Sequence, residues 1–271
     1  MAASRACVSI SGEMRVIELY HADISTCSQK VRLCLAEKGL EWTSHPIDFA
    51  KAEHLAPAYL ALNPNGVVPT LVHDGVPVID SSVICEYLEE IAPKQGTALM
   101  PSTPYGRARV RAWMRYIEEV PTAAIRVPSF NGLFLSGWRQ MSDAQRARYI
   151  ESTPLRKGHY RRFGTEGFAK EQVDESIERL RQTVERVDAA VAKGPWLAGD
   201  AISIADLCVL PTIVRMSDIG LEGVWADLPE FNRWYDRMKA RPSFDKAFYP
   251  GSRVGLPAND RTANADAVQS K

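Results

Sequence analysis

The turn Ser25–Ser28 places a hydroxyl group and a thiol at the start of a pattern typical of a helix. The N-terminus of a helix carries unpaired N–H groups and a partial positive charge, so it stabilises a negatively charged sulfur nearby. The Ser25 hydroxyl could donate a hydrogen bond to such a thiolate, and Cys27 could itself act as a nucleophile. Two structural interpretations compete with this chemistry: Ser25 as a simple helix cap, and Cys27 as a small apolar residue on the buried side of the helix.

Two further places could hold a peptide-like ligand. Val68 precedes Pro69, and a cis bond there would turn the Val68 backbone outward to pair with an extended peptide. Asp80 and Ser81 lie where another helix should begin, so N–H groups and a hydroxyl could hold a carboxylate while Asp80 pairs with an amine, with Ser82 assisting. Simple helix capping explains Asp80 and Ser81 as well.

The elements that must position these residues can be read from apolar periodicity. Residues 15–20 predict a strand, a helix follows the Ser25 turn as far as Gly39, and a second strand is expected at 42–47. The pair Asp74-Gly75 separates two β-rich runs at 69–72 and 76–79, which indicates an antiparallel hairpin. Short helical turns are expected within 51–65, and an apolar stripe predicts a helix from about residue 83 to Pro93.

A Pro-rich and Gly-rich stretch, 94–104, predicts a linker between an α/β domain at 15–93 and an all-helical domain at 105–250. Helices are expected at 105–119, after a capping pair at Ser142 and Gln145, at 173–187, after a second pair at Ser203 and Asp206, and at 229–242. Residues 1–14 are predicted to form a flexible extension and 251–271 a disordered tail.

Composition restricts the classes of partner. Lys plus Arg and Asp plus Glu number 33 each, so no overall field attracts nucleic acid or an anionic membrane. No apolar stretch approaches the roughly 20 residues that span a bilayer. The five cysteines are scattered and odd in number, which fits a reducing cytoplasm. Metal-binding and nucleotide-binding motifs are absent from the sequence, so we expect a soluble cytoplasmic protein with no metal, nucleic-acid or membrane partner.

An α/β unit containing Val68, Pro69 and Thr70, followed by helices, resembles the cytosolic glutathione transferase superfamily over nearly the whole chain. The segment Ser25–Arg32 resembles the Ser-Ser-Cys-Ser-x-Arg-Val-Arg signature of zeta-class enzymes, and also the Ser/Cys turn of tetrachlorohydroquinone reductive dehalogenases. In contrast, residues 83–89, 141–143 and 156–168 resemble bacterial glutathione-dependent β-aryl etherases, which do not carry this Ser/Cys turn.

The resemblance implies a thioredoxin-like N-terminal domain, an all-α C-terminal domain, glutathione as co-substrate and a homodimer. Ser25 would stabilise the glutathione thiolate, and Cys27 would form a mixed disulfide in the dehalogenase chemistry. The residues expected to bind the rest of glutathione are Ser28, Lys51, His54, Val68, Pro69, Asp80, Ser81 and Ser82. For Lys51 and His54, which would hold the glycyl carboxylate, an ordinary solvent-facing loop is the equal alternative.

The helical domain should supply a pocket for a hydrophobic or aromatic electrophile. We expect this pocket to use Trp113, Tyr116, Arg126 and the stretch 130–138, although such aromatic residues also build ordinary cores. The basic run 156–162 could meet an acidic substrate or nucleic acid, or form a solvated surface.

Attack of glutathione on an electrophilic carbon is the favoured function, with β-aryl ether cleavage as the leading reaction. Reductive dehalogenation through Cys27 and a zeta-like isomerisation are the rival reactions. A non-catalytic protein of the same fold, which binds ligands or another protein, is the rival of a different class.

Overall fold

A mixed sheet organises the first half of the molecule in this computed structural model, which describes residues 16–255. Its four strands lie in the order β2-β1-β3-β4. Strand β1 (Ile17–His21) runs parallel to β2 (Thr43–Pro46) and antiparallel to β3 (Thr70–His73), which pairs antiparallel with β4 (Val76–Ile79). Asp74 and Gly75 form the β3–β4 turn with φ of 50° and 80°, so the predicted hairpin is confirmed.

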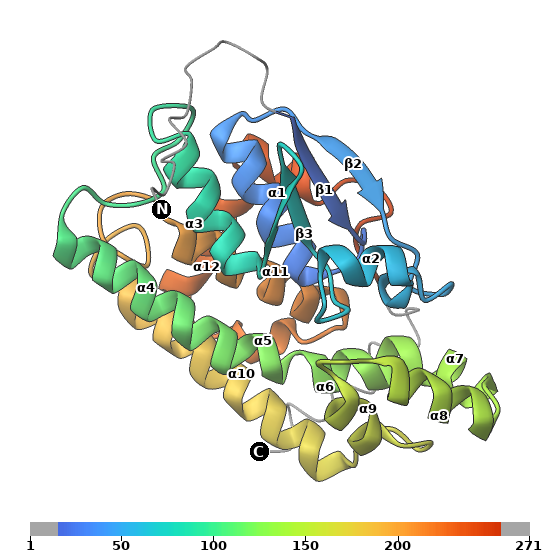
Figure 1. Cartoon of the computed structure of the whole chain (residues 1–271). Coiled ribbons are helices and arrows are strands. Elements are labelled where there is room, and N and C mark those ends of the chain that lie inside the picture. Colours follow the sequence, from blue (N-terminus) through green and yellow to red (C-terminus); the bar gives the residue numbers. More distant parts are fainter. Residues whose placement is uncertain (1–15, 256–271) are drawn as a thin grey trace, which may run out of the picture.

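Helices cover both faces of this sheet (Figure 1). On one face α1 (Thr26–Lys38) packs beside α3 (Ser81–Ile91), and both share a core with Leu19 and Leu71 of the sheet. On the other face η1 (Glu53–Leu55) and α2 (Pro57–Leu62) bring Tyr59 against Ala22 and Val68. The loop that follows β1 therefore leads into α1 where the helices of the two faces meet.

The second half is helical, as expected. The long helices are α4 (Pro104–Glu119), α10 (Lys170–Val191) and α11 (Ile204–Asp218), followed by η3 (Glu222–Trp225), α12 (Pro229–Lys239) and α13 (Pro242–Ala247). Helix α11 is buried almost throughout and contacts both α1 and α4. Its predicted capping residue Asp206 accepts from the Ser203 N–H at 3.0 Å and from the Trp234 indole at 2.9 Å. The capped start of α11 thereby also anchors α12.

Short helices connect α4 to α10 and form a separate small core. They are α5 (Pro121–Ala124), α6 (Arg126–Ser129), the π-helical η2 (Phe130–Phe134), α7 (Leu135–Gln140), α8 (Asp143–Ser152) and α9 (Lys157–Phe163). Trp138, Phe163 and Phe168 are buried at the centre of this core. Figure 1 shows the group at one end of the molecule, beneath α2. We call α7–α9 with η2 the aromatic wall.

The disordered tail predicted from residue 251 is wrong for residues 251–255. Ser252 is fully buried, its carbonyl accepts from the Gln29 side chain at 2.8 Å, and Arg253 pairs with Asp218. Buried polar groups on α1 and α11 need partners, and this segment supplies them. The predicted extension at 1–14 and the rest of the predicted tail lie outside the described residues.

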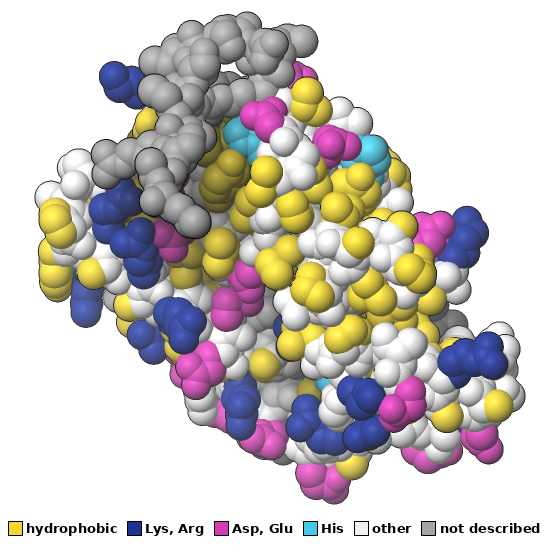
Figure 2. Space-filling view, viewed as in Figure 1, with side chains coloured by type: hydrophobic (Ala, Val, Ile, Leu, Met, Phe, Trp, Pro, Cys, Tyr) yellow, Lys and Arg dark blue, Asp and Glu magenta, His cyan; other side chains and the backbone are white. Residues whose placement is uncertain are grey.

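Surface charges of both signs are mixed. Figure 2 shows Lys and Arg alternating with Asp and Glu along the lower edge, where α4 and α10 run, and hydrophobic side chains gathered over the sheet half. Within residues 16–255 no helix is both long enough and apolar enough to cross a membrane.

Candidate functional site

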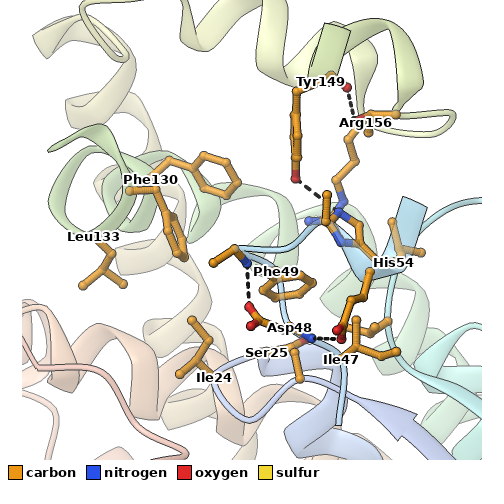
Figure 3. A pocket seen from close by; sticks show the side chains of 18 of the residues that line it. Ile24, Ser25, Ile47, Asp48, Phe49, His54, Phe130, Leu133, Tyr149 and Arg156 are labelled. Atoms are coloured by element: carbon orange, nitrogen blue, oxygen red, sulfur yellow. Dashed lines mark hydrogen bonds between the residues drawn. The ribbon is translucent and has the colours of Figure 1, made fainter. Parts of the chain in front are cut away.

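A cavity of about 1330 Å³ lies between the sheet half and the helical half. The loop before α1, the segment 46–54 and the Gly66–Val68 stretch form one side, and α6, η2 and the aromatic wall form the other. In Figure 3, Ser25 lies on the first side, with Phe130 and Tyr149 across the cavity. The cavity therefore joins the predicted thiol-activating turn to the predicted acceptor side.

Ser25 is the N-cap of α1 and also lines the cavity. Its Oγ accepts a hydrogen bond from the Ser28 N–H at 3.3 Å, so the capping interpretation is confirmed. Because Oγ is the acceptor in that bond, the hydroxyl hydrogen is not used by it. The same side chain can therefore cap the helix and donate to a ligand in the cavity.

Cys27 is partly exposed and lines the cavity, whereas Cys34, Cys85 and Cys208 are fully buried. The interpretation of Cys27 as a buried apolar residue is therefore wrong. Lys30 lies one turn further along α1, fully buried, with its ammonium against Glu118. Burial opposes the charge of Lys30, but Glu118 outweighs it and raises the pKa of Lys30, so a permanent positive charge lies beneath the turn.

Ser28 and Arg215 both hold the turn, but only Arg215 also lines the cavity. The Ser28 side chain is fully buried and accepts from the Ala22 N–H at 3.3 Å, so its predicted contact with glutathione is not supported. Arg215, which no pattern in the sequence singled out, reaches from α11 and donates to the Ile24 carbonyl. Burial lowers the pKa of Arg215 to about 10, so it remains charged at neutral pH.

The Val68–Pro69 peptide bond is cis. Val68 lines the cavity, and among the described residues neither its N–H nor its carbonyl makes a hydrogen bond. Pro69 lies buried behind it at the start of β3. An extended peptide in the cavity would find a free donor and a free acceptor at Val68.

The predicted site at the start of α3 lies beyond the cavity lining. Asp80 caps the helix, with Oδ1 accepting from the N–H groups of Ser82 at 2.9 Å and Val83 at 3.2 Å. The Ser82 hydroxyl donates to Glu118 at 2.6 Å, so its hydrogen is already used, and its predicted role toward glutathione stays a prediction. Ser81 is buried. Asp80 is exposed, and its second carboxylate oxygen, Oδ2, takes no part in the capping bonds. The capping interpretation of Asp80 is confirmed, and its role toward an amine stays a prediction.

Lys51 and His54 both line the cavity but differ in kind. Lys51 is exposed at the rim and pairs with Asp48 at 3.3 Å. His54 is buried, and its Nε2 shares a hydrogen bond with the Tyr149 hydroxyl at 3.1 Å. Burial, reinforced by the charge of Arg156, lowers the pKa of His54 to about 4. His54 is therefore a neutral donor or acceptor at neutral pH.

Trp113 and Tyr116 are not in the cavity, so their predicted place in the acceptor pocket is wrong. The Tyr116 hydroxyl bonds to Thr183 of α10 at 2.9 Å, and the Arg186 guanidinium lies over its ring at 4.2 Å. That guanidinium also covers the Trp113 ring at 5.1 Å. Both residues lie on the face of α4 that packs on α10, which explains their aromatic spacing.

The acceptor side is built instead from Arg126, residues of the 130–138 stretch, Arg156 of the predicted basic run, and Tyr149, which the sequence did not single out. The Trp138 and Tyr160 rings stack with centroids 5.5 Å apart. Lys157 and Arg161, from the basic run, pair with Glu151 at the surface. Tyr149 lies in α8 and Arg156 at the start of α9, and a loop separates the two helices. Their spacing in the sequence therefore does not predict that they line the same cavity.

The comparisons with known proteins agree with this geometry. The model of the glutathione S-transferase N-terminal domain matches residues 24–91, and that of the C-terminal domain matches residues 170–237. Protein LigF of Sphingobium sp. (strain NBRC 103272 / SYK-6) is 30% identical over 248 residues, 89% of this chain and 96% of the relative. The crystal structure of beta-etherase LigF has a TM-score of 0.78 at 28% identity and covers 86% of this chain and 98% of its own.

Two other relatives match over similar lengths. Maleylacetoacetate isomerase of Pseudomonas aeruginosa is 32% identical over 89% of this chain and 100% of its own length. Tetrachloro-p-hydroquinone reductive dehalogenase of Sphingobium chlorophenolicum is 27% identical over 86% of this chain and 96% of its own. On the two matched domains and these full-length similarities, the chain belongs to the glutathione S-transferase family.

Proposed function

We propose that this chain activates the thiol of glutathione, its co-substrate, at Ser25 and directs the thiolate at an aromatic electrophile in the cavity. The observation that carries this proposal is the position of Ser25. Its Oγ accepts the capping bond, which leaves its hydrogen for a sulfur in the cavity. The N-terminus of α1 adds positive potential at the same point.

The remaining residues suit the rest of glutathione. The unpaired backbone of Val68 fits its cysteinyl peptide unit, and Asp80 with Ser81 stays the candidate for its γ-glutamyl end. Lys51 at the rim is the cationic candidate for the glycyl carboxylate. His54 would contribute only a neutral contact, because the pKa of its imidazole lies at about 4.

Cleavage of a β-aryl ether is the specific reaction that we favour. The thiolate attacks the carbon that bears the aryloxy group, a C–S bond forms, and the C–O bond breaks. The aryloxide departs with the electron pair and takes up the proton that the thiol released. Support comes from the similarity to beta-etherase LigF and from rings that line the acceptor side, including Phe130, Trp138 and Tyr160.

Ser25→Ala tests the proposal. With 1-chloro-2,4-dinitrobenzene, or a phenacyl ether of 4-methylumbelliferone, we expect kcat/KM to fall by about 100-fold, as for loss of one donor to developing negative charge. Thr103→Ala is the control, because Thr103 caps α4 through its side chain outside the cavity lining. Each variant should lose about 1 kcal/mol of stability with its cap, but Thr103→Ala should keep full activity. Absence of glutathione binding by calorimetry, with no turnover of either acceptor, would refute the proposal.

The partly exposed thiol of Cys27 favours one second candidate, a reductive dehalogenation. Glutathione displaces the halide as a thioether, and the Cys27 thiolate attacks its sulfur. The ring carbon leaves and takes up a proton, and a second glutathione reduces the Cys27–glutathione disulfide to give oxidised glutathione. Cys27→Ala should abolish such a reaction on a halogenated hydroquinone while it leaves ether cleavage intact. We also propose a homodimer, as the family resemblance implies. Sedimentation velocity would show a species of twice the chain mass.

A further inference from the structure

Arg126 of α6 and Arg156, at the start of α9, are two cations on the acceptor side of the cavity. Among residues 16–255 neither makes an ion pair or a side-chain hydrogen bond. Both arginines are partly exposed to the cavity, whereas two buried cations nearby have partners: Lys30 meets Glu118, and Arg215 donates to the Ile24 carbonyl. Glu118 influences Arg126 only at longer range, because it is already bonded to Lys30 and Ser82.

The two guanidinium groups lie close enough to repel one another. Burial lowers the pKa of Arg126, and the charge of Arg156 is the next largest cause. A partly buried charge without a counter-ion loses part of its hydration and gains nothing in exchange, and a like charge on the same wall adds to the cost. An anion between the two would relieve both effects.

The surroundings of the pair indicate what kind of anion fits. Figure 3 shows the Arg156 side chain directed toward His54 and the Tyr149 hydroxyl. Only 5% of His54 is exposed, and its Nδ1 is buried there without a partner among the described residues. The rings of Phe130 and Tyr160 flank the same region with centroids 5.7 Å apart. Aromatic rings, two guanidinium groups and an unpaired imidazole nitrogen therefore line the same cavity.

We propose that Arg126 and Arg156 bind the carboxylate of an aromatic acceptor, so that the chain prefers electrophiles with an anionic group beyond the reacting carbon. A guanidinium group matches a carboxylate with two parallel hydrogen bonds, and a ring stacks on the neighbouring side chains. Glutathione has no ring, and the free backbone of Val68 that suits it lies on the opposite side of the cavity. This inference rests on the proposed transferase function and names its substrate class.

Two acceptors that differ in charge at one position test the proposal: 4-chloro-3-nitrobenzoate and 4-chloro-3-nitrobenzamide. Each rate is divided by the uncatalysed rate with glutathione, because the two groups activate the ring differently. We expect the wild type to prefer the benzoate by at least about 10-fold, as for a charge-assisted hydrogen bond. Arg126→Gln and Arg156→Gln should each lower kcat/KM for the benzoate by about 10-fold to 100-fold and leave the benzamide within about 2-fold.

Arg161→Gln is the matched control, because Arg161 lies on the same short helix but is exposed and paired with Glu151. It should change neither acceptor. Arg156→Lys keeps the charge without the paired donors and should retain part of the preference. An equal rate with both acceptors in the wild type would overturn the proposal. So would an Arg126→Gln variant whose KM for glutathione rises with both acceptors, since the pair would then hold a glutathione carboxylate.

Binding separates this inference from the proposed function. The glutathione conjugates of the two acceptors are prepared chemically and titrated by calorimetry. Tighter binding of the benzoate conjugate, lost in Arg126→Gln, supports the arginine site whether or not the wild type turns over 1-chloro-2,4-dinitrobenzene or the phenacyl ether, the acceptors that test the transferase proposal. Equal binding of both conjugates to the wild type would refute the arginine site.

Discussion

His54 is an imidazole held neutral on the sheet side of the cavity, facing the side that carries two arginines. Burial is the main cause of its lowered pKa, and Arg156 adds to it. The consequence is chemical: one ring nitrogen can engage Tyr149, and the other can donate to or accept from a ligand, but the ring supplies no positive charge. The positive charge of this part of the cavity therefore comes from the arginines.

Neutral buried histidines predict a pH dependence of stability. His21, His54 and His159 each have a pKa of about 4 in the folded chain, against an ordinary value of 6.5, with burial as the first cause. Below pH 6.5 the unfolded chain binds protons that the folded chain does not, so stability is lost as the pH falls from 6.5 toward 4. Between pH 6.5 and 5, each histidine should remove about 2 kcal/mol from the free energy of unfolding.

Urea unfolding of the wild type and of His54→Gln at pH 7 and pH 5 measures this effect. Glutamine can still bond to Tyr149 but does not titrate, so the loss of stability between the two pH values should shrink by about 2 kcal/mol. An identical loss in both proteins would show that His54 is not held neutral.

Two glycines lie at the C-terminal end of α1, and each is required there for a different reason. Gly39 follows the helix with φ of 60° and has open space where a side chain would begin. Gly96 has φ of 59°, but a Cβ there would lie 2.3 Å from the Glu37 carbonyl oxygen. The first needs glycine for its backbone conformation alone, and the second also needs it for a close approach of two chain segments.

Gly39→Ala and Gly96→Ala therefore form a matched pair. The first should lower the free energy of unfolding by about 1 kcal/mol, the cost of a left-handed alanine. The second should cost several times as much, because backbone atoms cannot move aside as a side chain would. Equal urea midpoints for the two variants would contradict the predicted contact at Gly96.

The Asn131 side chain ties the aromatic wall to the segment just before α10. The Asn131 amide donates to the Phe168 carbonyl at 2.9 Å, and its oxygen accepts from the Phe168 N–H at 2.8 Å. Asn131→Ala removes both hydrogen bonds and should loosen the wall. Because this wall positions the aromatic acceptor, KM for the acceptor should rise by about 10-fold, whereas KM for glutathione should not change. Asn232→Ala is the control: its amide bonds the Leu228 carbonyl at 2.9 Å, outside the cavity lining, and steady-state kinetics should stay unchanged.

Local signals in the sequence predicted the elements well and the contacts between distant elements poorly. The Asp74-Gly75 turn and the Asp206 cap depend on neighbours within a few residues, so their residue types sufficed. Trp113 was misplaced because an aromatic residue at helical spacing looks the same whether it faces a cavity or another helix. The sequence predicts one basic run for Arg156 and Arg161, either facing an acidic partner or solvated, but the start of α9 turns Arg156 into the cavity and leaves Arg161 at the surface.

At the scale of the whole molecule, α1 joins the two halves. Its Gln29 bonds to Ser252, and its Glu37 accepts two hydrogen bonds from Arg241, at 2.6 Å and 2.7 Å. These partners lie more than 200 residues away in sequence, beyond the reach of any local pattern. Because α1 also carries the Ser25 turn, the helical half positions that turn as well as the acceptor side of the cavity.

A substitution at Glu37 can test whether the sheet half and the helical half unfold as one unit. Its carboxylate is almost fully buried and also accepts from Ser243 and Thr97. Burial alone would raise the pKa of Glu37, but the bonds from Arg241, Ser243 and Thr97 lower it, so the carboxylate is charged at neutral pH. Its stabilising effect should persist above the ordinary pKa of a glutamate and be lost as the pH falls below that value.

Glu37→Gln should lower the free energy of unfolding by about 3 kcal/mol, because it leaves Arg241 without its counter-ion. Glu230→Gln, which breaks an exposed pair with Arg233, should cost no more than about 0.5 kcal/mol. Urea unfolding is followed by far-ultraviolet circular dichroism and by tryptophan fluorescence. If α1 couples the halves, both probes should give one coincident transition in each protein, shifted in Glu37→Gln at constant slope. Separate transitions in the wild type would show instead that the sheet half and the helical half unfold independently.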